Sequence, residues 1–528
     1  MTVFPPETDE TPIDRLLRRQ QTLDTPVARF SKEQAELEAP RFRELIPLTA
    51  PAPGRQYAFE VDLDKCTGCK ACVAACHSLN GLDEEETWRD VGLLHGGTAR
   101  EPYLQTVTTA CHHCTDPACL NGCPVNAYEK DPATGIVSHL DDQCIGCQYC
   151  VLKCPYEVPK YSKSLGIVRK CDMCHGRLAE GEAPACVQAC PNEAIRITTV
   201  DTAEEAARHR NSASGGSTFL PGTVDPGYTV PTTRYTGRPV PADARAADAD
   251  TPRPEHAHWP LVLMLVLTQG SVGVLAAALA MVDPLPALAL SAGLCLVGLK
   301  ASLFHLGKPF KAWRAFLGLT HSWLSREIIV FGAYFPLLLG ALLLASPPAA
   351  WIPFAPPGFV FPATMGAALA AGLAGVFCSA MIYHDTRRPF WKLHRSAAKF
   401  FGTAWILGAA GALVVAPSLP AALLLIAGTL AKLACEARHF HPDALGPDKP
   451  AVGSTRVILC CLLRVHANRL LLGAAGGILL PLLFLAGAVP AAVAAVLAFG
   501  LCLSAETTER YLYLRAVVPF KMPGGIAS

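Results

Sequence analysis

Cysteine is the residue type whose spacing in this sequence points most directly to chemistry. Sixteen of the 22 cysteines lie between positions 66 and 190, in four groups of four, and a proline follows the last cysteine of three of the groups. The groups are Cys66, Cys69, Cys72 and Cys76; Cys111, Cys114, Cys119 and Cys123; Cys144, Cys147, Cys150 and Cys154; and Cys171, Cys174, Cys186 and Cys190.

This spacing is typical of [4Fe–4S] clusters. Three thiolates on one tight loop can each reach a different iron of a cubane, and the fourth cysteine, before a proline that redirects the chain, serves a partner cluster. A zinc site instead takes four ligands in two pairs. The cysteines therefore predict four [4Fe–4S] clusters, each with a full set of ligands.

The order of the groups favours one assignment of the fourth cysteines. The second and third groups form one ferredoxin-like unit, which is nested between the first and fourth groups as the other unit. With fourth cysteines exchanged inside each unit, Cys123 ligates the third group's cluster and Cys154 the second group's cluster. Cys190 then completes the cluster of the first group, and Cys76 that of the fourth.

Several histidines lie near these ligands or near apolar segments, and we interpret none of them as a metal ligand. Sixteen thiolates already suffice for four clusters, so the histidines beside cysteines are hydrogen-bonding or surface residues. No histidine pair lies within facing apolar segments as a bis-histidine haem would require, so we predict no haem. The histidines considered are His112, His113, His175, His305, His384 and His439.

The composition changes sharply near Trp259, which divides the chain into two unlike halves. All sixteen cysteines of the four groups lie in the first half, so its fold must position them. We predict an N-terminal arm over 1–57, a ferredoxin-like domain over 58–200, a linker over 201–257 and a membrane anchor domain over 258–528. The fold class is an α+β double-ferredoxin-like iron–sulfur domain followed by an all-α polytopic membrane domain. The polar start of the chain is unlike a signal peptide, since Arg18 and Arg19 are followed by no apolar run.

The second half contains apolar segments long enough to cross a bilayer, which takes about 20 residues per helix. Eight transmembrane helices are predicted, with six or seven as alternatives, because the last four segments form two apolar stretches broken by Pro417, Pro420 and Pro490. The predicted spans are 259–282, 285–303, 328–344, 361–383, 400–415, 419–434, 470–488 and 490–504. A formal net charge of +1 gives no reason to expect a nucleic acid partner.

Both halves resemble the dimethyl sulfoxide reductase family. The stretch from Cys144 to Tyr156 and the segment from Arg169 to Cys174 resemble its four-cluster electron-transfer subunit. The membrane half resembles its anchor subunit through 305–309, 312–315 and 322–327. The resemblance implies the same pairing of cysteine groups and a separate catalytic subunit with a molybdenum bis-pterin cofactor. These subunits are usually separate chains, whereas here they are fused.

The resemblance also implies a quinone site. The family's quinol-binding residues carry over onto His305 and Glu327, with Arg314 between them as an orienting donor. Ionisable residues at membrane depth are functional candidates, and quinone chemistry needs proton-exchanging groups; menaquinone or ubiquinone is the expected exchangeable substrate. The alternative is that His305 caps a helix and Glu327 pairs with Arg326 or Arg314. Weaker candidates are Tyr383, Asp385, Glu436, His439, Glu509 and Arg510.

Charge asymmetry predicts the orientation in the inner membrane. The loops on the side of the cysteines carry many Lys and Arg residues, whereas the opposite loops carry essentially only Asp283. By the positive-inside rule the iron–sulfur domain faces the cytoplasm.

Three functions remain open from the sequence. The first is an electron relay between membrane quinol and the catalytic subunit, which does not itself transform the final substrate. The second is the same architecture in a cytoplasm-facing sulfite dehydrogenase that reduces quinone. The third is a non-redox metal-binding sensor or transporter.

Overall fold

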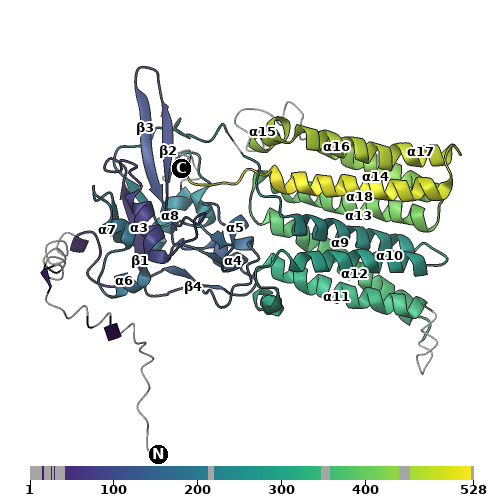
Figure 1. Ribbon diagram of the computed structural model, residues 1–528, viewed down its shortest axis with the longest axis horizontal. Coiled ribbons are helices and arrows are strands. Elements are labelled where there is room, and N and C mark those ends of the chain that lie inside the picture. The colour runs from purple at the N-terminus through teal and green to yellow at the C-terminus, as the bar shows by residue number, and fades with distance from the viewer. Residues whose placement is uncertain are drawn as a thin grey trace, which may run out of the picture.

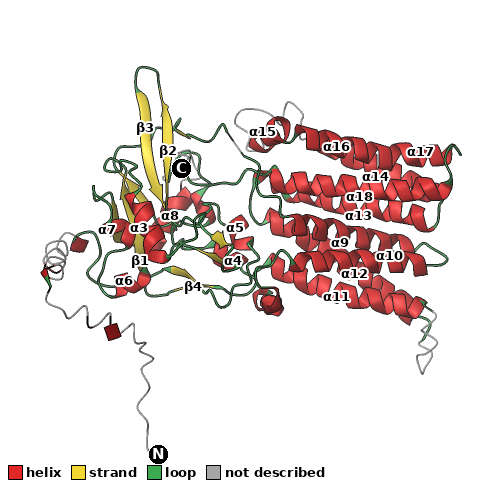
Figure 2. Cartoon of the chain, in the orientation of Figure 1, coloured by secondary structure: helices red, strands yellow, loops and turns green. Residues whose placement is uncertain are grey.

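The computed structural model describes residues 42–211, 219–251, 253–346, 357–438 and 452–524, with a few isolated positions between 15 and 32. Most of the predicted arm, including Arg18, therefore lies outside the described residues. Figure 1 shows the cysteine-bearing domain at one end of a bundle of long helices, and Figure 2 shows that the strands lie in the cysteine domain.

Paired strands enclose the nested cysteine groups. Strand β1, before the first group, pairs antiparallel with β8, after the fourth group, and the β4–β5 hairpin lies between the second and third groups. A second sheet has the order β10-β2-β3, and β6 pairs with β7. The strands are β1 (Arg55–Asp62), β2 (Asp90–Gly97), β3 (Pro102–Thr109), β4 (Tyr128–Lys130), β5 (Val137–His139), β6 (Lys160–Ser162), β7 (Ile167–Arg169), β8 (Ile195–Asp201), β9 (Arg234–Thr236) and β10 (Arg245–Ala246).

Short helices carry the later cysteines of each group. Helix α3, from the first group, packs against α7, from the fourth, and α4, from the second, packs against α5, from the third. The helices are α3 (Ala71–Asn80), α4 (Ala118–Gly122), α5 (Tyr149–Lys153), α6 (His175–Ala179), α7 (Ala185–Gln188) and α8 (Thr202–Asn211). The helix packing thus follows the nesting of the groups along the chain.

The segment 201–257, predicted as an irregular linker, supplies structure to the cysteine domain. Within it, β9 pairs in parallel with β1, β10 pairs with β2, and a short 3-10 helix, η2, spans Pro226–Tyr228. Phe219, Leu220 and Val224 join the core of the domain. These few apolar residues are diluted by Gly, Pro and polar neighbours, so composition alone did not reveal them.

Among the described residues, eight helices are long and apolar enough to cross a membrane, as predicted. Such helices satisfy their backbone hydrogen bonds internally, which the hydrocarbon interior requires. Seven of them are single helices: α9 (Trp259–Ala278), α10 (Leu285–Leu303), α11 (Trp323–Ala345), α12 (Val360–His384), α13 (Leu393–Val415), α14 (Leu419–Ala437) and α18 (Ala491–Arg515). The seventh span along the chain, Leu463–Leu485, consists of α16 (Leu463–Ala474), the π-helix η8 (Ala475–Leu479) and α17 (Leu480–Leu485).

Several spans extend beyond their predicted limits at the end near the cysteine domain. Helix α13 begins at Leu393 rather than 400, and α18 continues to Arg515 rather than 504. The added turns carry Lys399, Glu506 and Arg510, whose charges lower the hydropathy although the side chains are largely buried between helices. In the parts of the connections that the structure describes, the short helices are η3 (Pro309–Gly318), η5 (Pro389–Trp391) and α15 (Val452–Cys461).

Helix α9 lies at the centre of the bundle and packs against α10 and α13. The contact with α13 depends on small residues, because a Cβ atom at Gly273 would lie 1.8 Å from the Ala404 carbonyl oxygen. After α18 the chain returns to the cysteine domain, where the Leu93 amide donates to the Gly524 carbonyl (3.2 Å) and Met522 enters the core.

Candidate functional site

Two cavities in the cysteine domain are each lined by four cysteines. One is bordered by Cys111, Cys114, Cys119 and Cys154, and the other by Cys66, Cys69, Cys72 and Cys190. Each cavity brings three cysteines of one group together with the last cysteine of another. Among the described residues, no three His, Cys, Asp or Glu side chains converge on a point that could hold a single metal ion.

The remaining thiols are related in the same way. Burial raises the pKa of the Cys147 thiol, and the nearby thiols of Cys123 and Cys144 raise it further. Burial also raises the pKa of the Cys76 thiol to about 12, with a further contribution from Cys186. Without iron such thiols stay protonated, whereas cluster ligation requires thiolates. The donor set therefore fits iron–sulfur clusters.

Two buried cations lie among the cysteines. Although burial opposes its charge, the thiols of Cys186, Cys72 and Cys171 raise the pKa of the Arg89 guanidinium. In the same way, against the effect of burial, the thiols of Cys111 and Cys119 raise the pKa of the Lys170 ammonium. Both cations are fixed by neutral partners: Arg89 donates to Thr108 Oγ1 (3.2 Å) and Lys170 donates to the Cys171 carbonyl (2.9 Å). Each can offset the negative charge of a thiolate-bound cluster.

The second and third cysteine groups rest on the connection between α10 and α11. The Lys308 amide donates to the Ile145 carbonyl (3.1 Å), and the Ser322 hydroxyl donates to the Gly122 carbonyl (2.8 Å). At Gly307 the two backbones approach so closely that a Cβ atom would lie 2.0 Å from the Gly166 carbonyl oxygen. Only glycine fits this contact, which fixes the distance between the cysteine loops and the anchor.

A second contact joins the third group to the end of α12. Lys153 forms an ion pair with Asp385 (2.7 Å), and the Tyr149 hydroxyl donates to the Ile382 carbonyl (3.1 Å). Arg388 donates to the Leu152 carbonyl (3.2 Å). The loop that carries Cys147 is therefore held from two sides over the mouth of the bundle.

A cavity of about 220 Å³ lies directly beneath this loop. Its walls are mostly apolar, and its polar side chains are those of His305, Glu327, Tyr149, Tyr383 and Ser302, with Cys147 at its border. Glu327 is 4% exposed and accepts a hydrogen bond from the Ser379 hydroxyl. Burial lowers the pKa of the His305 imidazole, against a hydrogen bond with the Cys147 backbone. The cavity suits a flat apolar ring whose polar atoms exchange protons.

The structure separates the candidates into three places. His305, Glu327 and Tyr383 border the cavity. Arg314 does not; its guanidinium donates to the Asp142 carbonyl (3.0 Å) at the contact between the two domains. Asp385 also belongs to that contact, His439 lies outside the described residues, and Glu436, Glu509 and Arg510 lie in a charged network elsewhere in the bundle.

The alternative roles of His305 and Glu327 can be compared with their contacts. The polar partner of Glu327 among the described residues is Ser379, whereas Arg326 donates to the Leu319 and Thr320 carbonyls.

Sequence reasoning did not single out Tyr149, Arg89 or Lys170. Tyr149 and Lys170 lie directly beside cysteines in the motifs, but only the fold shows that Arg89 lies near the first and fourth groups.

A domain with four cysteine groups on an eight-helix bundle defines a membrane-anchored iron–sulfur electron-transfer protein. Comparison with known proteins gives the family. Residues 57–78 match a 4Fe-4S binding domain, residues 103–200 a 4Fe-4S dicluster domain, and residues 255–514 the DMSO reductase anchor subunit (DmsC).

Relatives of the cysteine domain agree with this. The B subunit of the anaerobic dimethyl sulfoxide reductase of Escherichia coli (strain K12) is 38% identical over 154 residues, which cover 28% of this chain and 75% of that protein. The corresponding B subunit of Haemophilus influenzae is 37% identical over 155 residues, with the same coverage, 28% and 75%. The Hydrogenase-2 operon protein HybA of Escherichia coli O157:H7 is 34% identical over 195 residues, which cover 32% of this chain and 59% of that protein. The chain belongs to the dimethyl sulfoxide reductase family and fuses its iron–sulfur and anchor subunits.

Proposed function

We propose that this protein relays electrons between membrane quinone and a separate molybdopterin-containing catalytic subunit. The sixteen cysteines hold four [4Fe–4S] clusters, which supply one-electron carriers when bound. The ligand sets are Cys66, Cys69, Cys72 and Cys190; Cys111, Cys114, Cys119 and Cys154; Cys144, Cys147, Cys150 and Cys123; and Cys171, Cys174, Cys186 and Cys76. The two cavities with mixed cysteine sets and the proximity of Cys123 to Cys147 support this pairing.

The observation that carries the quinone proposal is a single cavity bordered by His305, Glu327 and Cys147. Quinol oxidation releases two protons and two electrons, so proton acceptors must lie beside an electron acceptor. His305 and Glu327 accept or return the two protons. The two electrons would leave one at a time through the cluster that the ligand set of Cys147 would hold. The apolar walls fit the ring of menaquinone or ubiquinone, which enters from the bilayer.

The route away from the cavity leads through the nested units. The second and fourth ligand sets are neighbours. Burial raises the pKa of the Cys171 thiol, and the nearby thiols of Cys111 and Cys76 raise it further. Cys69, in the first group, is exposed at the protein surface. We infer that electrons move from the third ligand set to the second, then to the fourth and the first, where the catalytic subunit docks near Cys69.

The charge distribution favours a second candidate with the reverse flow. Basic residues gather at the helix ends beside the cysteine domain, including Lys308, Lys311, Arg387 and Arg388. The positive-inside rule then supports a cytoplasmic iron–sulfur domain. In that compartment the complex would suit sulfite oxidation with quinone reduction. Reporter fusions after Leu279 and after Arg438 test the orientation, because only the second should lie in the cytoplasm.

The deciding experiment uses the complex purified from native membranes. We expect a large subunit to co-purify with molybdenum, and turnover with quinol and dimethyl sulfoxide, or with sulfite and quinone. His305→Ala and Glu327→Gln should each lower quinone-linked turnover about 100-fold or more, while dithionite still bleaches the clusters; His384→Ala is the matched control. Full turnover in both variants would refute the quinone site, and a complex without molybdenum would refute the partner.

A further inference from the structure

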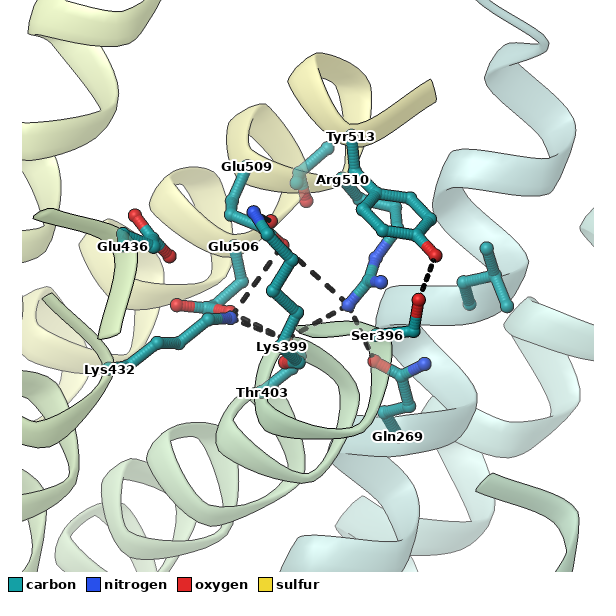
Figure 3. Close-up of polar contacts among 12 residues, drawn as sticks. Gln269, Ser396, Lys399, Thr403, Lys432, Glu436, Glu506, Glu509, Arg510 and Tyr513 are labelled. Carbon is teal, nitrogen blue, oxygen red and sulfur yellow. Dashed lines mark hydrogen bonds and ion pairs between the residues drawn. The ribbon is translucent and has the colours of Figure 1, made fainter. Parts of the chain in front are cut away.

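The second half of the bundle holds a charged network that the quinone proposal does not use. Lys399 pairs with Glu509 (2.5 Å), Lys432 pairs with Glu506, and Arg469 pairs with Glu436 (2.9 Å). Arg469 belongs to α16. Figure 3 shows the lysines and glutamates of the network converging from α13, α14 and α18, with Thr403 among them. Charged residues at this depth are costly and normally serve a function.

Among the described residues of this region, the cations outnumber the carboxylates. Each of the three glutamates has its own cation, and Arg510 remains with neutral acceptors, Gln269 (3.0 Å) and Thr403 (3.2 Å), and a longer approach of 3.7 Å to Glu509. Arg510 is 0% exposed, and its Nε and Nη1 atoms have no hydrogen-bond partner among the described residues. The region therefore has an excess of positive charge and free donors.

A cavity of about 330 Å³ opens beside this network, between α13 and α14. Four of its lining side chains are Lys or Arg, and one is a carboxylate that is already paired with Arg469. Lys399 and Lys432 form its floor, where their glutamate partners hold them in place. Arg395 and Arg438 form its rim, and a buried Nη1 atom of Arg395 has no partner among the described residues. Such a cavity recognises an anion with several acceptor oxygens.

The position of the cavity indicates where the anion comes from. Arg395 is the third residue of α13 and Arg438 directly follows α14, so both lie where these spans leave the membrane interior. Farther along the same helices, Trp405, Leu424 and Leu430 are each about half exposed and form an apolar surface. Basic pockets between transmembrane helices at this level suit acidic lipid headgroups.

We propose that this cavity binds the headgroup phosphate of an anionic phospholipid from the leaflet on the side of the cysteine domain. The phosphate meets Arg395, Arg438 and the two floor lysines, and the acyl chains lie along the surface around Trp405. A free phosphate ion offers the same oxygens but leaves that apolar surface unused. The site does not depend on the quinone proposal, because it lies in the other half of the bundle.

The test compares anionic lipid bound to the full chain and to a rim variant. The chain is placed in nanodiscs of phosphatidylcholine with phosphatidylglycerol, and retained lipid is measured by native mass spectrometry. Arg395→Gln with Arg438→Gln should weaken retention roughly 25-fold, since each basic residue near an anionic lipid contributes about fivefold. Lys392→Gln with Arg464→Gln removes two exposed charges at neighbouring helix ends and should retain the lipid.

Three outcomes would overturn the proposal. Equal loss in the control variant would show general attraction to the membrane surface. Equal retention in the rim variant would show that the cavity is not the site. Displacement of the lipid by inorganic phosphate at equal concentration would identify a soluble anion as the ligand. Cluster absorbance and monodispersity check that each variant is folded, which the exposed position of Arg438 and the partial exposure of Arg395 favour.

Discussion

The two halves of the membrane bundle bury ionisable groups in different ways. In α9 to α12, Glu327 has a hydroxyl as its partner and borders a cavity beside the cysteine loops. In α13 to α18, each glutamate of the network has a lysine or arginine within 2.9 Å. A carboxyl group without a cation is free to exchange a proton, whereas a paired one stabilises the packing of helices. Burial alone therefore does not distinguish a candidate quinone residue from a structural one, whereas the partner of the buried carboxyl group separates Glu327 from the glutamates of the network.

The largest effect is expected from the cysteine at the border of the cavity. Cys147→Ser removes one ligand of the third set, and quinone-linked electron transfer should fall to background because the relay starts there. Iron analysis and electron paramagnetic resonance should show the loss of one cluster signal. Cys295→Ser, a buried cysteine of α10 outside the four groups, should leave both unchanged. Normal transfer in Cys147→Ser would remove this set from the route.

The contrast between the two halves predicts that a Glu→Gln substitution lowers stability in the charged network but lowers turnover at the cavity. Glu506→Gln leaves Lys432 without its closest partner, and we expect a loss of about 3 kcal/mol or more in stability. Glu327→Gln breaks no ion pair and should leave the unfolding midpoint in detergent nearly unchanged while turnover falls. The measurement is thermal unfolding of both variants beside turnover per folded molecule. If Glu506→Gln instead abolished turnover at full stability, the network would take part in the redox reaction.

A buried cation among the cysteines should tune the clusters. Lys170→Met removes a positive charge near the second and fourth groups, so reduction becomes less favourable and the midpoint potential falls. For an assumed separation of about 8 Å and an effective dielectric constant of about 20, the change is roughly 2 kcal/mol, or about 90 mV for one electron. A redox titration followed by electron paramagnetic resonance measures it. Lys163→Met, whose pair with Glu85 lies at the surface, should give no shift, and an equal shift would refute the local effect.

The smallest effect concerns the contact between the domains. Asp385→Asn weakens the pair with Lys153, and the cysteine domain should lose about 1 kcal/mol of stability, because Lys153 keeps the Asp385 carbonyl as an acceptor. Heat-induced cluster bleaching reports this change. Glu85→Gln is the exposed control and should behave like the unmodified chain. A larger loss that also slows cluster reduction by quinol would mean that the pair sets the position of Cys147.

Sequence reasoning predicted the fold well where patterns are periodic. Long apolar runs gave all eight spans, and motif spacing gave the iron–sulfur domain. It failed where charged residues are buried beside partners of opposite charge: Lys399 and Glu506 lower the hydropathy of their helices, so the predicted helix limits were too short. It also missed the core residues of 201–257, because prolines, glycines and polar residues surround them in the sequence. His305 and Glu327 were predicted from the anchor motif. Tyr149 could not be predicted as a cavity residue, because its position there depends on how the two domains dock.

The return of the last residues to β2 has a consequence for biosynthesis. Met522 belongs to a core that includes cysteines of all four groups, and Gly524 extends the hydrogen bonding of the second sheet. During translation this core stays incomplete until all eight spans have been made. We therefore expect the anchor to reach the membrane before this core is complete, an interval in which iron–sulfur clusters could be assembled.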